Sequence, residues 1–298
     1  MKRIVLFVLT NLAVVVVLSI VLSLLGVDRW ITSRGINYQM LLVFSLVIGF
    51  GGSFFSLAIS KWIAKHAYGI EVIHEPRTES EAWLVNEIQG LAEKAGVAVP
   101  EVGIYDSPEA NAFATGPSRN SALVAVSSGL IGTMNTRQLQ GVLAHEMSHV
   151  ANGDMVTMTL LQGTLNTFVI FFSRVLGFAL DQFLRRGDDN DRRGVGMGYY
   201  LGYFVCQIVL GLLASLIVNA YSRGREFRAD AMGARLEGKD AMIGALQRLK
   251  QITEGGGVID DRSPAISAFK INHPTGWMRL FASHPPLEER IAALESLR

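Results

Sequence analysis

The sequence predicts an α+β protein that is mainly helical and integral to a membrane, with up to four transmembrane helices and a small β-sheet. Half of its 298 residues are hydrophobic and only 18% are charged. With a mean hydropathy of +0.32, the chain is too apolar for an ordinary soluble protein of this size. Long apolar stretches alternate with segments that carry soluble helix and strand patterns.

Composition also excludes several classes of protein. The net charge is +1, and no basic patch is interleaved with aromatic residues, so we expect no nucleic-acid partner. The single cysteine, Cys206, lies inside an apolar stretch, which leaves neither a disulfide framework nor a thiolate metal site. Any metal ligands must therefore be histidines and carboxylates.

The first two apolar stretches predict a transmembrane hairpin. Ile4–Leu25 is long enough to cross a hydrocarbon core of about 30 Å as a helix. A signal peptide is the alternative, but no small-residue cleavage site precedes Asp28–Trp30. Met40–Ile59 is the second span. Lys2 lies before the hairpin and Lys65 after it, so the positive-inside tendency places both ends in the cytoplasm.

The segment Thr136–Asn152 predicts one amphipathic helix, with Asn135 or Thr136 as its N-cap. His145 and His149 are four residues apart, so both imidazoles lie on one face and can bind one metal ion. Glu146 lies beside the first histidine, where a general base for a zinc-bound water belongs. The plain alternative is a chance pattern of surface or hydrogen-bonded histidines.

A small sheet is expected beside this helix. Val102–Tyr105, Ala112–Thr115 and Leu123–Val126 read as short strands. In a protease, an exposed strand edge can bind an extended substrate through main-chain hydrogen bonds. We expect that role for the third strand, with an interior position as the alternative; its candidate substrate-binding residues are Leu123, Val124, Ala125 and Val126.

A second hydrophobic hairpin follows the histidine helix. Met155–Phe172 and Tyr199–Ala220 are apolar, and the link between them, Asp181–Arg193, is strongly charged. If both stretches cross the membrane, the link lies outside and its arginines oppose the positive-inside tendency. Whether this second hairpin fully spans the bilayer therefore stays open.

Two carboxylates after the second hairpin are candidates for the metal site. Glu226 and Asp230 are four residues apart, on one helical face. One can bind the metal while the other orients a metal-binding histidine. An acidic pair on a solvated helix is the alternative.

These motifs together resemble the HtpX-type membrane zinc metalloproteases, which are relatives of the CAAX prenyl proteases. The resemblance rests on His145–His149, on the Glu226-x-x-x-Asp230 pair, and on His284-Pro285-Pro286-Leu287 through Arg290. Asn111–Gly116 and the two hydrophobic hairpins also fit. A metzincin is excluded, because its pattern needs a third histidine where Met155 stands.

The resemblance implies a zincin-like catalytic domain of the gluzincin type with one Zn²⁺ per chain. It implies Glu226 as the third ligand, Asp230 as a carboxylate behind the ligands, and His284 as an oxyanion stabiliser with Arg290 nearby. Asn111 becomes a candidate substrate-binding residue. The implied substrates are misfolded or damaged membrane proteins, cut at the cytoplasmic face of a bacterial plasma (inner) membrane as part of the stress response.

The chain is thus expected to have four parts. They are a transmembrane hairpin (1–60), the first part of the catalytic domain (61–153), the second hairpin (154–220) and the second part of the catalytic domain (221–298). The expected partners are polypeptide substrates and the lipid bilayer. Two alternatives stay open, namely a CAAX-type prenyl-peptide protease and a non-enzymatic, zinc-stabilised membrane scaffold.

Overall fold

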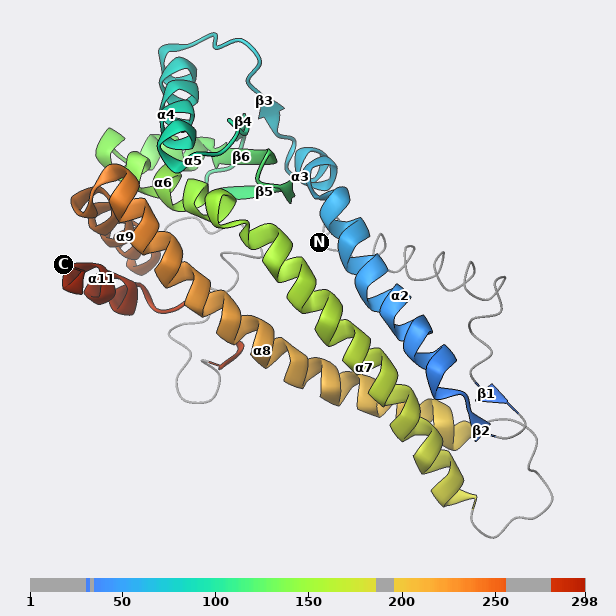
Figure 1. Ribbon diagram of the computed structural model, residues 1–298. Helices are drawn as coiled ribbons and strands as arrows, with labels where there is room; N and C mark the ends of the chain where they lie inside the picture. Colours follow the sequence, from blue (N-terminus) through green and yellow to red (C-terminus); the bar gives the residue numbers. More distant parts are fainter. Residues whose placement is uncertain (1–30, 33–34, 186–195, 256–279, 298) are drawn as a thin grey trace. The chain divides into compact units, whose positions relative to one another are not determined.

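The computed structural model describes residues 31–32, 35–185, 196–255 and 280–297 (Figure 1). The chain divides into two compact units. The catalytic unit comprises Leu57–Thr157 and Asn219–Arg298, and the apolar unit comprises the described parts of Lys2–Ser56 and Met158–Val218. The first predicted span, Ile4–Leu25, lies outside the described residues.

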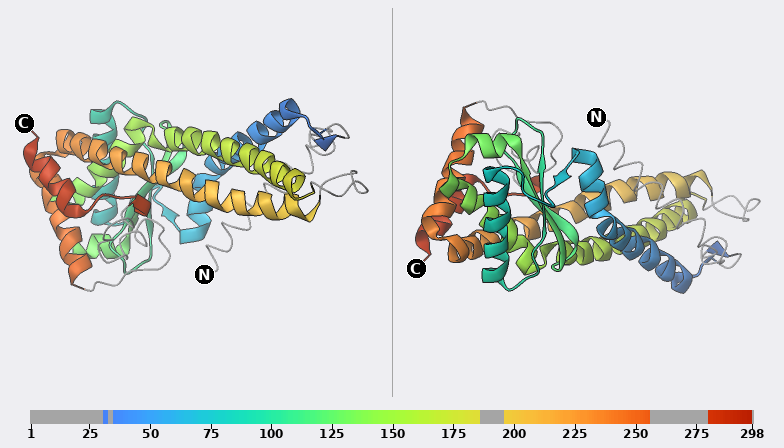
Figure 2. Two further views of the ribbon diagram at one scale, coloured as in Figure 1. Left: turned by 90° about the horizontal axis from the view of Figure 1, so that it is seen from below. Right: turned by 90° about the horizontal axis from the view of Figure 1, so that it is seen from above.

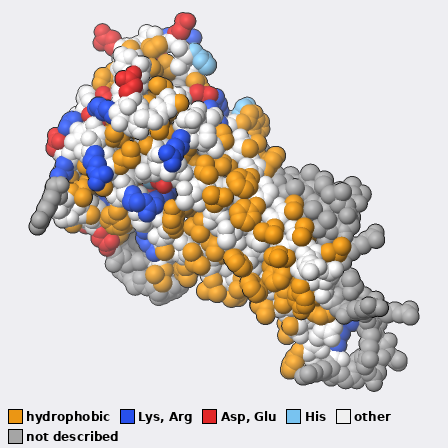
Figure 3. All heavy atoms as spheres, in the orientation of Figure 1, with side chains coloured by type: hydrophobic (Ala, Val, Ile, Leu, Met, Phe, Trp, Pro, Cys, Tyr) orange, Lys and Arg blue, Asp and Glu red, His pale blue; other side chains and the backbone are white. Residues whose placement is uncertain are grey.

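Three described helices are long and apolar enough to cross a membrane. They are α2 (Tyr38–Ala58), α7 (Asp154–Leu184) and α8 (Met197–Glu237). Large hydrophobic side chains are exposed along all three helices, and Figure 3 shows hydrophobic side chains gathered over this part of the molecule. Each corresponds to a predicted apolar stretch, and a short ribbon of β1 (Ile31–Thr32) and β2 (Gly35–Ile36) precedes α2.

Small residues let helices of the apolar unit pack closely. A Cβ atom added at Gly49 of α2 would lie 2.4 Å from Thr167 Oγ1 of α7 and 3.0 Å from the carbonyl oxygen of Gly163. This position needs glycine because the backbones of α2 and α7 approach so closely.

The predicted link between the last two spans begins later than expected. Asp181 belongs to α7 and is buried, and its carboxylate accepts hydrogen bonds from the backbone N–H groups of Gly196 (2.9 Å) and Tyr199 (3.2 Å). The first N–H groups of a helix have no partner within the helix, and its N-terminus favours negative charge, so the Asp181 carboxylate is stabilised at the start of α8. The interpretation of Asp181–Leu184 as link was therefore wrong.

The catalytic unit contains a four-stranded sheet in the order β3-β4-β6-β5. The strands are β3 (Glu71–Val72), β4 (Glu101–Tyr105), β5 (Ala112–Ser118) and β6 (Ser121–Ser127). Strands β4 and β6 are parallel, and the other pairs are antiparallel. The three predicted strands are β4, β5 and β6.

Both faces of β6 are covered by helices. Val124 and Val126 point into the core shared with α4 (Glu79–Ala95) and α6 (Thr136–Asn152). Leu123 and Ala125 point to the opposite face, where α3 (Ser60–Tyr68) packs, and Figure 2 shows α3 and α4 on opposite sides of the sheet. The predicted edge role of Leu123–Val126 is wrong, because β6 pairs on both sides with β4 and β5. In the described sheet, β5 is the edge beside β6.

Three further helices belong to the described part of the catalytic unit. They are α5 (Ser128–Thr133), α9 (Lys239–Glu254) and α11 (Leu287–Ser296). Buried side chains of all three join those of α4 and α6 in one core. Helix α6 therefore lies between the sheet and α9, which fixes the direction of its histidines.

Candidate metal centre

Helix α6 begins and ends as its sequence dictates. The Asn135 side chain accepts a hydrogen bond from the Gln138 backbone N–H (2.9 Å), and the Gln138 side chain accepts one from the Asn135 N–H (3.1 Å). Of the two predicted N-caps, the structure has Asn135, and the two hydrogen bonds form a capping box. Gly153 ends the helix with φ 67° and donates its N–H to the carbonyl oxygens of His149 and Val150. His145 and His149 lie one turn apart, with their Nε2 atoms separated by 3.2 Å.

Glu226 reaches the two histidines from α8. This helix is continuous from its apolar portion to Glu237, and Glu226 is fully buried. Its Oε2 lies 3.4 Å from His145 Nε2, and its Oε1 lies 3.4 Å from His149 Nε2. A Cβ atom at Gly233 would lie 2.7 Å from Met242 Sδ and 3.3 Å from the His145 backbone nitrogen. Glycine at this position therefore lets α8 approach α6.

The three side chains fit a metal ion. Ligand atoms of His145, His149 and Glu226 all lie within 4.8 Å of one another. Tetrahedral zinc with ligand bonds of about 2.0–2.1 Å requires ligand atoms about 3.3 Å apart, and the three separations are 3.2, 3.4 and 3.4 Å. Two imidazoles and one carboxylate are also a donor set that zinc enzymes use.

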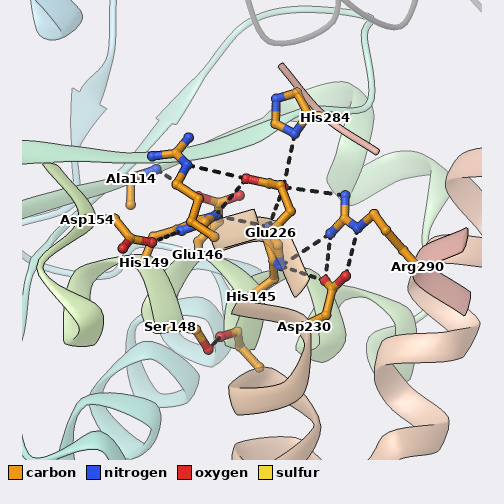
Figure 4. Close-up of polar contacts among 12 residues, drawn as sticks. Ala114, His145, Glu146, Ser148, His149, Asp154, Glu226, Asp230, His284 and Arg290 are labelled. Carbon is orange, nitrogen blue, oxygen red and sulfur yellow. Dashed lines mark hydrogen bonds and ion pairs between the residues drawn. The ribbon is translucent and has the colours of Figure 1, made fainter. Parts of the chain in front are cut away.

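A carboxylate and an arginine support His145 (Figure 4). Asp230 Oδ1 lies 2.9 Å from His145 Nδ1, which leaves Nε2 directed toward Glu226. The Arg290 guanidinium donates two hydrogen bonds to Asp230, of 2.7 and 2.6 Å. Both Asp230 and Arg290 are almost completely buried, so the pair is shielded from water.

A second carboxylate, which the sequence analysis missed, supports His149. Asp154 is the first residue of α7 and is buried, and its Oδ2 lies 2.6 Å from His149 Nδ1. The sequence held a signal for it, because an acidic residue directly follows the glycine that ends the histidine helix. That signal does not show that the chain turns back toward His149.

The charges of the site shift several pKa values. Burial alone would raise the pKa of Asp230, but Arg290 outweighs it and lowers the pKa to about 2. Burial would lower the pKa of His145, but hydrogen bonds with Asp230 and Glu226 raise it to about 9. The pKa of Glu226 lies far below its usual range, because three histidines overcome the effect of burial. Asp230 and Glu226 are therefore anionic at neutral pH.

Glu146 is held at the edge of the sheet. Its Oε2 accepts a hydrogen bond of 2.9 Å from the backbone N–H of Ala114 on β5. Sequence reasoning missed this contact, because a backbone donor leaves no mark in the side-chain pattern. Glu146 follows His145 on α6, so its carboxylate lies beside the candidate metal ligands and points to the edge strand.

His284 and Arg225 also face Glu226. His284 Nδ1 lies 2.9 Å from Glu226 Oε2, and Arg225 Nε lies 3.6 Å from Oε1. The structure thus brings together the residues that the sequence predicted for the site, although they come from three distant segments. They are His145, Glu146, His149, Glu226, Asp230, His284 and Arg290.

Asn111 lies where β5 begins. Its main chain bonds to β6, with the Ser127 N–H donating to the Asn111 carbonyl oxygen at 2.9 Å. In an antiparallel pair, alternate residues direct their main-chain groups away from the partner. Ala112 and Ala114 are those residues, and the bond from Ala114 to Glu146 agrees with this assignment.

Apolar helices of membrane-spanning length, joined to a buried His-His-Glu cluster with an adjoining glutamate, define a membrane metallopeptidase. Residues 78–298 match Peptidase family M48. The chain belongs to this family, and it is a metalloendopeptidase that acts on peptide bonds.

Curated relatives match the chain over its full length, as two examples show. The chain is 60% identical over 298 residues to "Protease HtpX homolog" of Methylacidiphilum infernorum (isolate V4), covering 99% of each chain. It is 52% identical over 298 residues to "Protease HtpX" of Tolumonas auensis (strain DSM 9187 / NBRC 110442 / TA 4), covering 100% of each. The resemblance that the motifs predicted is confirmed.

A solved structure shares the fold. The crystal structure of S. mikatae Ste24p matches with a TM-score of 0.62 and 20% identity, covering 85% of this chain and 58% of Ste24p. This likeness confirms the predicted membrane metalloprotease fold. The chain spans little more than half of Ste24p, so nothing about the activity of Ste24p follows for it.

Proposed function

We propose that this chain is a zinc-dependent membrane endopeptidase that cleaves misfolded or damaged membrane proteins at the cytoplasmic face of a bacterial plasma membrane, in membrane-protein quality control. Full-length similarity to HtpX proteases supports the class of enzyme. The single observation that carries the proposal is the His145–His149–Glu226 triangle, with separations of 3.2–3.4 Å. Glu146 lies directly beside it.

His145, His149 and Glu226 would hold one Zn²⁺. When bound, zinc supplies Lewis acidity that lowers the pKa of water toward about 7 and polarises a peptide carbonyl. Asp230 and Asp154 hold the two imidazoles through their Nδ1 atoms, so that each Nε2 points toward Glu226. Such supporting carboxylates fix the tautomer and the ring orientation of metal-binding histidines.

Glu146 is the proposed general base. Its carboxylate accepts one proton from the attacking water and later gives that proton to the nitrogen of the departing amine, so the proton count balances. The hydrogen bond from Ala114 keeps this carboxylate at the edge of β5. His284, on the other side of Glu226, is the proposed donor to the negative charge that forms on the carbonyl oxygen.

The substrate is proposed to bind as an added strand at β5. Ala112 and Ala114 direct their main-chain groups away from β6, and β5 is the edge strand beside β6 in the described sheet. An added strand is bound through its backbone and needs no particular sequence. This suits an enzyme that acts on many unfolded proteins.

Basic residues support the proposed orientation. Lys61 and Lys65 lie on α3, directly after α2, and both pair with Glu101 of β4, with Lys61 Nζ at 2.8 Å and Lys65 Nζ at 2.5 Å. Together with Lys2 and Arg3, they favour a cytoplasmic position for the ends of the first hairpin by the positive-inside tendency. The catalytic unit follows α2 and would then lie on that side.

The test replaces the base and leaves the metal ligands in place. Glu146→Gln should retain zinc and lose cleavage of an unfolded membrane protein by at least about a hundredfold. Glu79→Gln changes an exposed glutamate at the start of α4 and should cleave normally. If Glu146→Gln cleaves at the wild-type rate, the hydrolytic assignment is wrong, and a prenylated peptide as a parallel substrate tests the CAAX-type alternative.

A further inference from the structure

One face of α8 carries a row of polar side chains within the catalytic unit. Four polar residues recur along the helix at i, i+4, i+7 and i+11, so their side chains lie on the same face. They are Asn219, Arg223, Glu226 and Asp230. Glu226 and Asp230 belong to the candidate metal centre. Asn219 and Arg223 come before them on the helix, and the proposed hydrolysis has so far used neither.

Arg223 and Asn219 bind the main chain just before His284. The Nη1 atom of Arg223 donates hydrogen bonds to the carbonyl oxygens of Leu280 (3.1 Å) and Ala282 (2.7 Å). The Nδ2 atom of Asn219 donates one to the carbonyl oxygen of Phe281 (3.0 Å). Three successive carbonyl groups are thus held by two side chains of one helix. We call residues 280–286 the His284 segment.

The chain after His284 is held as well. Pro285 and Pro286 follow His284 directly. A proline ring fixes φ near −65° and favours an extended backbone for the residue before it. Pro285 is buried, and α11 begins after Pro286. Arg290 of α11 then bonds to Asp230, at the far end of the same polar row. Helix α8 therefore holds the chain on both sides of His284.

The position of His284 depends on these main-chain bonds. Ala282 lies two residues before His284, so only a few backbone torsions separate the oxygen bound by Arg223 from the His284 Cα atom. His284 Nδ1 lies 2.9 Å from Glu226 Oε2, and Figure 4 shows the ring directed at that carboxylate. A catalytic group displaced by about 1 Å can lose about a hundredfold in rate. Loss of the Arg223 bonds should therefore misplace the imidazole.

We propose that Arg223, assisted by Asn219, is a positioning residue for His284 in peptide hydrolysis. The inference rests on the proposed role of His284 as donor to the carbonyl oxygen of the substrate. Arg223 acts through the main chain of the His284 segment and not on the substrate. Because the charge on that oxygen develops only in the transition state, misplacing its donor lowers kcat and leaves KM unchanged.

The first experiment replaces the guanidinium by an apolar side chain of similar length. In the full chain in detergent with zinc, Arg223→Met should lower kcat for an unfolded membrane protein by about ten- to hundredfold, with KM changed by less than about twofold. Arg228→Met is the matched control. Arg228 is exposed on the same helix, with its guanidinium carbon 5.4 Å from the centroid of the Tyr221 ring, and its loss should change neither constant. A wild-type kcat in Arg223→Met overturns the proposal.

A double-mutant cycle separates positioning from a general structural role. In a His284→Ala background, Arg223→Met should change the remaining kcat by less than about twofold, because the group that it positions is already gone. The same fold loss in both backgrounds would show that Arg223 acts independently of His284. That result overturns the proposal.

Hydrogen exchange of the metal-free chain gives a readout that does not depend on activity. Peptides from the His284 segment should exchange at least about tenfold faster in Arg223→Met than in the wild type, since the segment has lost two of its attachments to α8. Peptides from α6 should exchange at the wild-type rate, and Arg228→Met should match the wild type throughout. Unchanged exchange of the His284 segment in Arg223→Met overturns the proposal.

A second variant covers the case in which Arg223→Met fails to fold. Asn219→Leu removes one hydrogen bond and should lower kcat by about two- to fivefold, again only when His284 is present; a wild-type kcat overturns the proposal. Failure of the positioning role is distinct from failure of the proposed function. In the first case Glu146→Gln and His284→Ala lose cleavage while Arg223→Met keeps it, and in the second Glu146→Gln cleaves like the wild type.

Discussion

The two histidines of α6 are supported in two different ways. His145 contacts Asp230, whose carboxylate is paired with the buried guanidinium of Arg290. His149 contacts Asp154, in the first turn of α7, where the helix dipole favours a negative charge. One support is thus a buried ion pair, and the other is a carboxylate at a helix start. The ion pair should matter more for stability, because breaking it leaves uncompensated buried charge.

The largest expected effect is loss of the ion pair. Arg290→Met should destabilise the metal-free protein by about 3–5 kcal/mol, because the Asp230 and Glu226 carboxylates lose their buried cation. Arg137→Met is the matched control, since Arg137 is exposed and pairs with Asp240 at 2.9 Å; it should cost at most about 1 kcal/mol. Denaturant unfolding in detergent measures the free energy of unfolding of both variants. Equal losses of stability would show that the buried ion pair stabilises the protein no more than a surface ion pair does.

Lowering the pH should weaken the same support of His145, because it protonates Asp230. The pKa of Asp230 is about 2 in the folded chain, against an ordinary value of 3.8. A carboxyl group whose pKa is lowered by folding stabilises the folded chain fully at pH values above its unfolded-state pKa. That stabilisation, here about 2 kcal/mol, is lost as the pH falls through the folded-state pKa. Unfolding measured at pH 5 and pH 2 should show this loss in the metal-free wild type. Asp230→Asn should lack this part of the loss, and an identical acid response in that variant would contradict it.

The smallest expected effect concerns the other histidine. Asp154→Asn keeps an oxygen that can accept a hydrogen bond from His149 but removes the charge. We expect zinc affinity to fall by about ten- to hundredfold, with little change in the stability of the metal-free chain. Competition with a zinc-binding dye measures the affinity, and Asp106→Asn, at an exposed position after β4, is the control. Unchanged affinity would mean that Asp154 does not support His149.

This comparison also shows how far the sequence predicts the site. Local patterns were sufficient for α6, since its caps, its length and the facing histidines all follow from adjacent residues. The Glu226-x-x-x-Asp230 pair was visible as a pattern, and the family resemblance supplied the choice between its members. Asp154 was missed because its role depends on the turn at Gly153, which directs the carboxylate back to a residue on the preceding helix.

The sheet shows the same limit. Short strand-like segments predicted that β4, β5 and β6 are strands, but strand order depends on pairing between distant segments. Leu123–Val126 is buried on both faces and lies between two partners. A run of six small and apolar residues, Ala122 to Ser127, was therefore better evidence for an interior strand than for an edge. The edge strand beside β6 is β5, whose polar and glycine-containing sequence gives a weaker strand signal.

The most direct test of the account is the number of zinc ions bound per chain. Wild type, Glu146→Gln and the exposed-site control Glu254→Ala should each bind one zinc, because none of these changes removes a ligand. Glu226→Ala should bind far less than one under the same conditions, because the third donor is lost. One zinc bound to Glu226→Ala with unchanged affinity would contradict the assignment of His145, His149 and Glu226 as the metal centre.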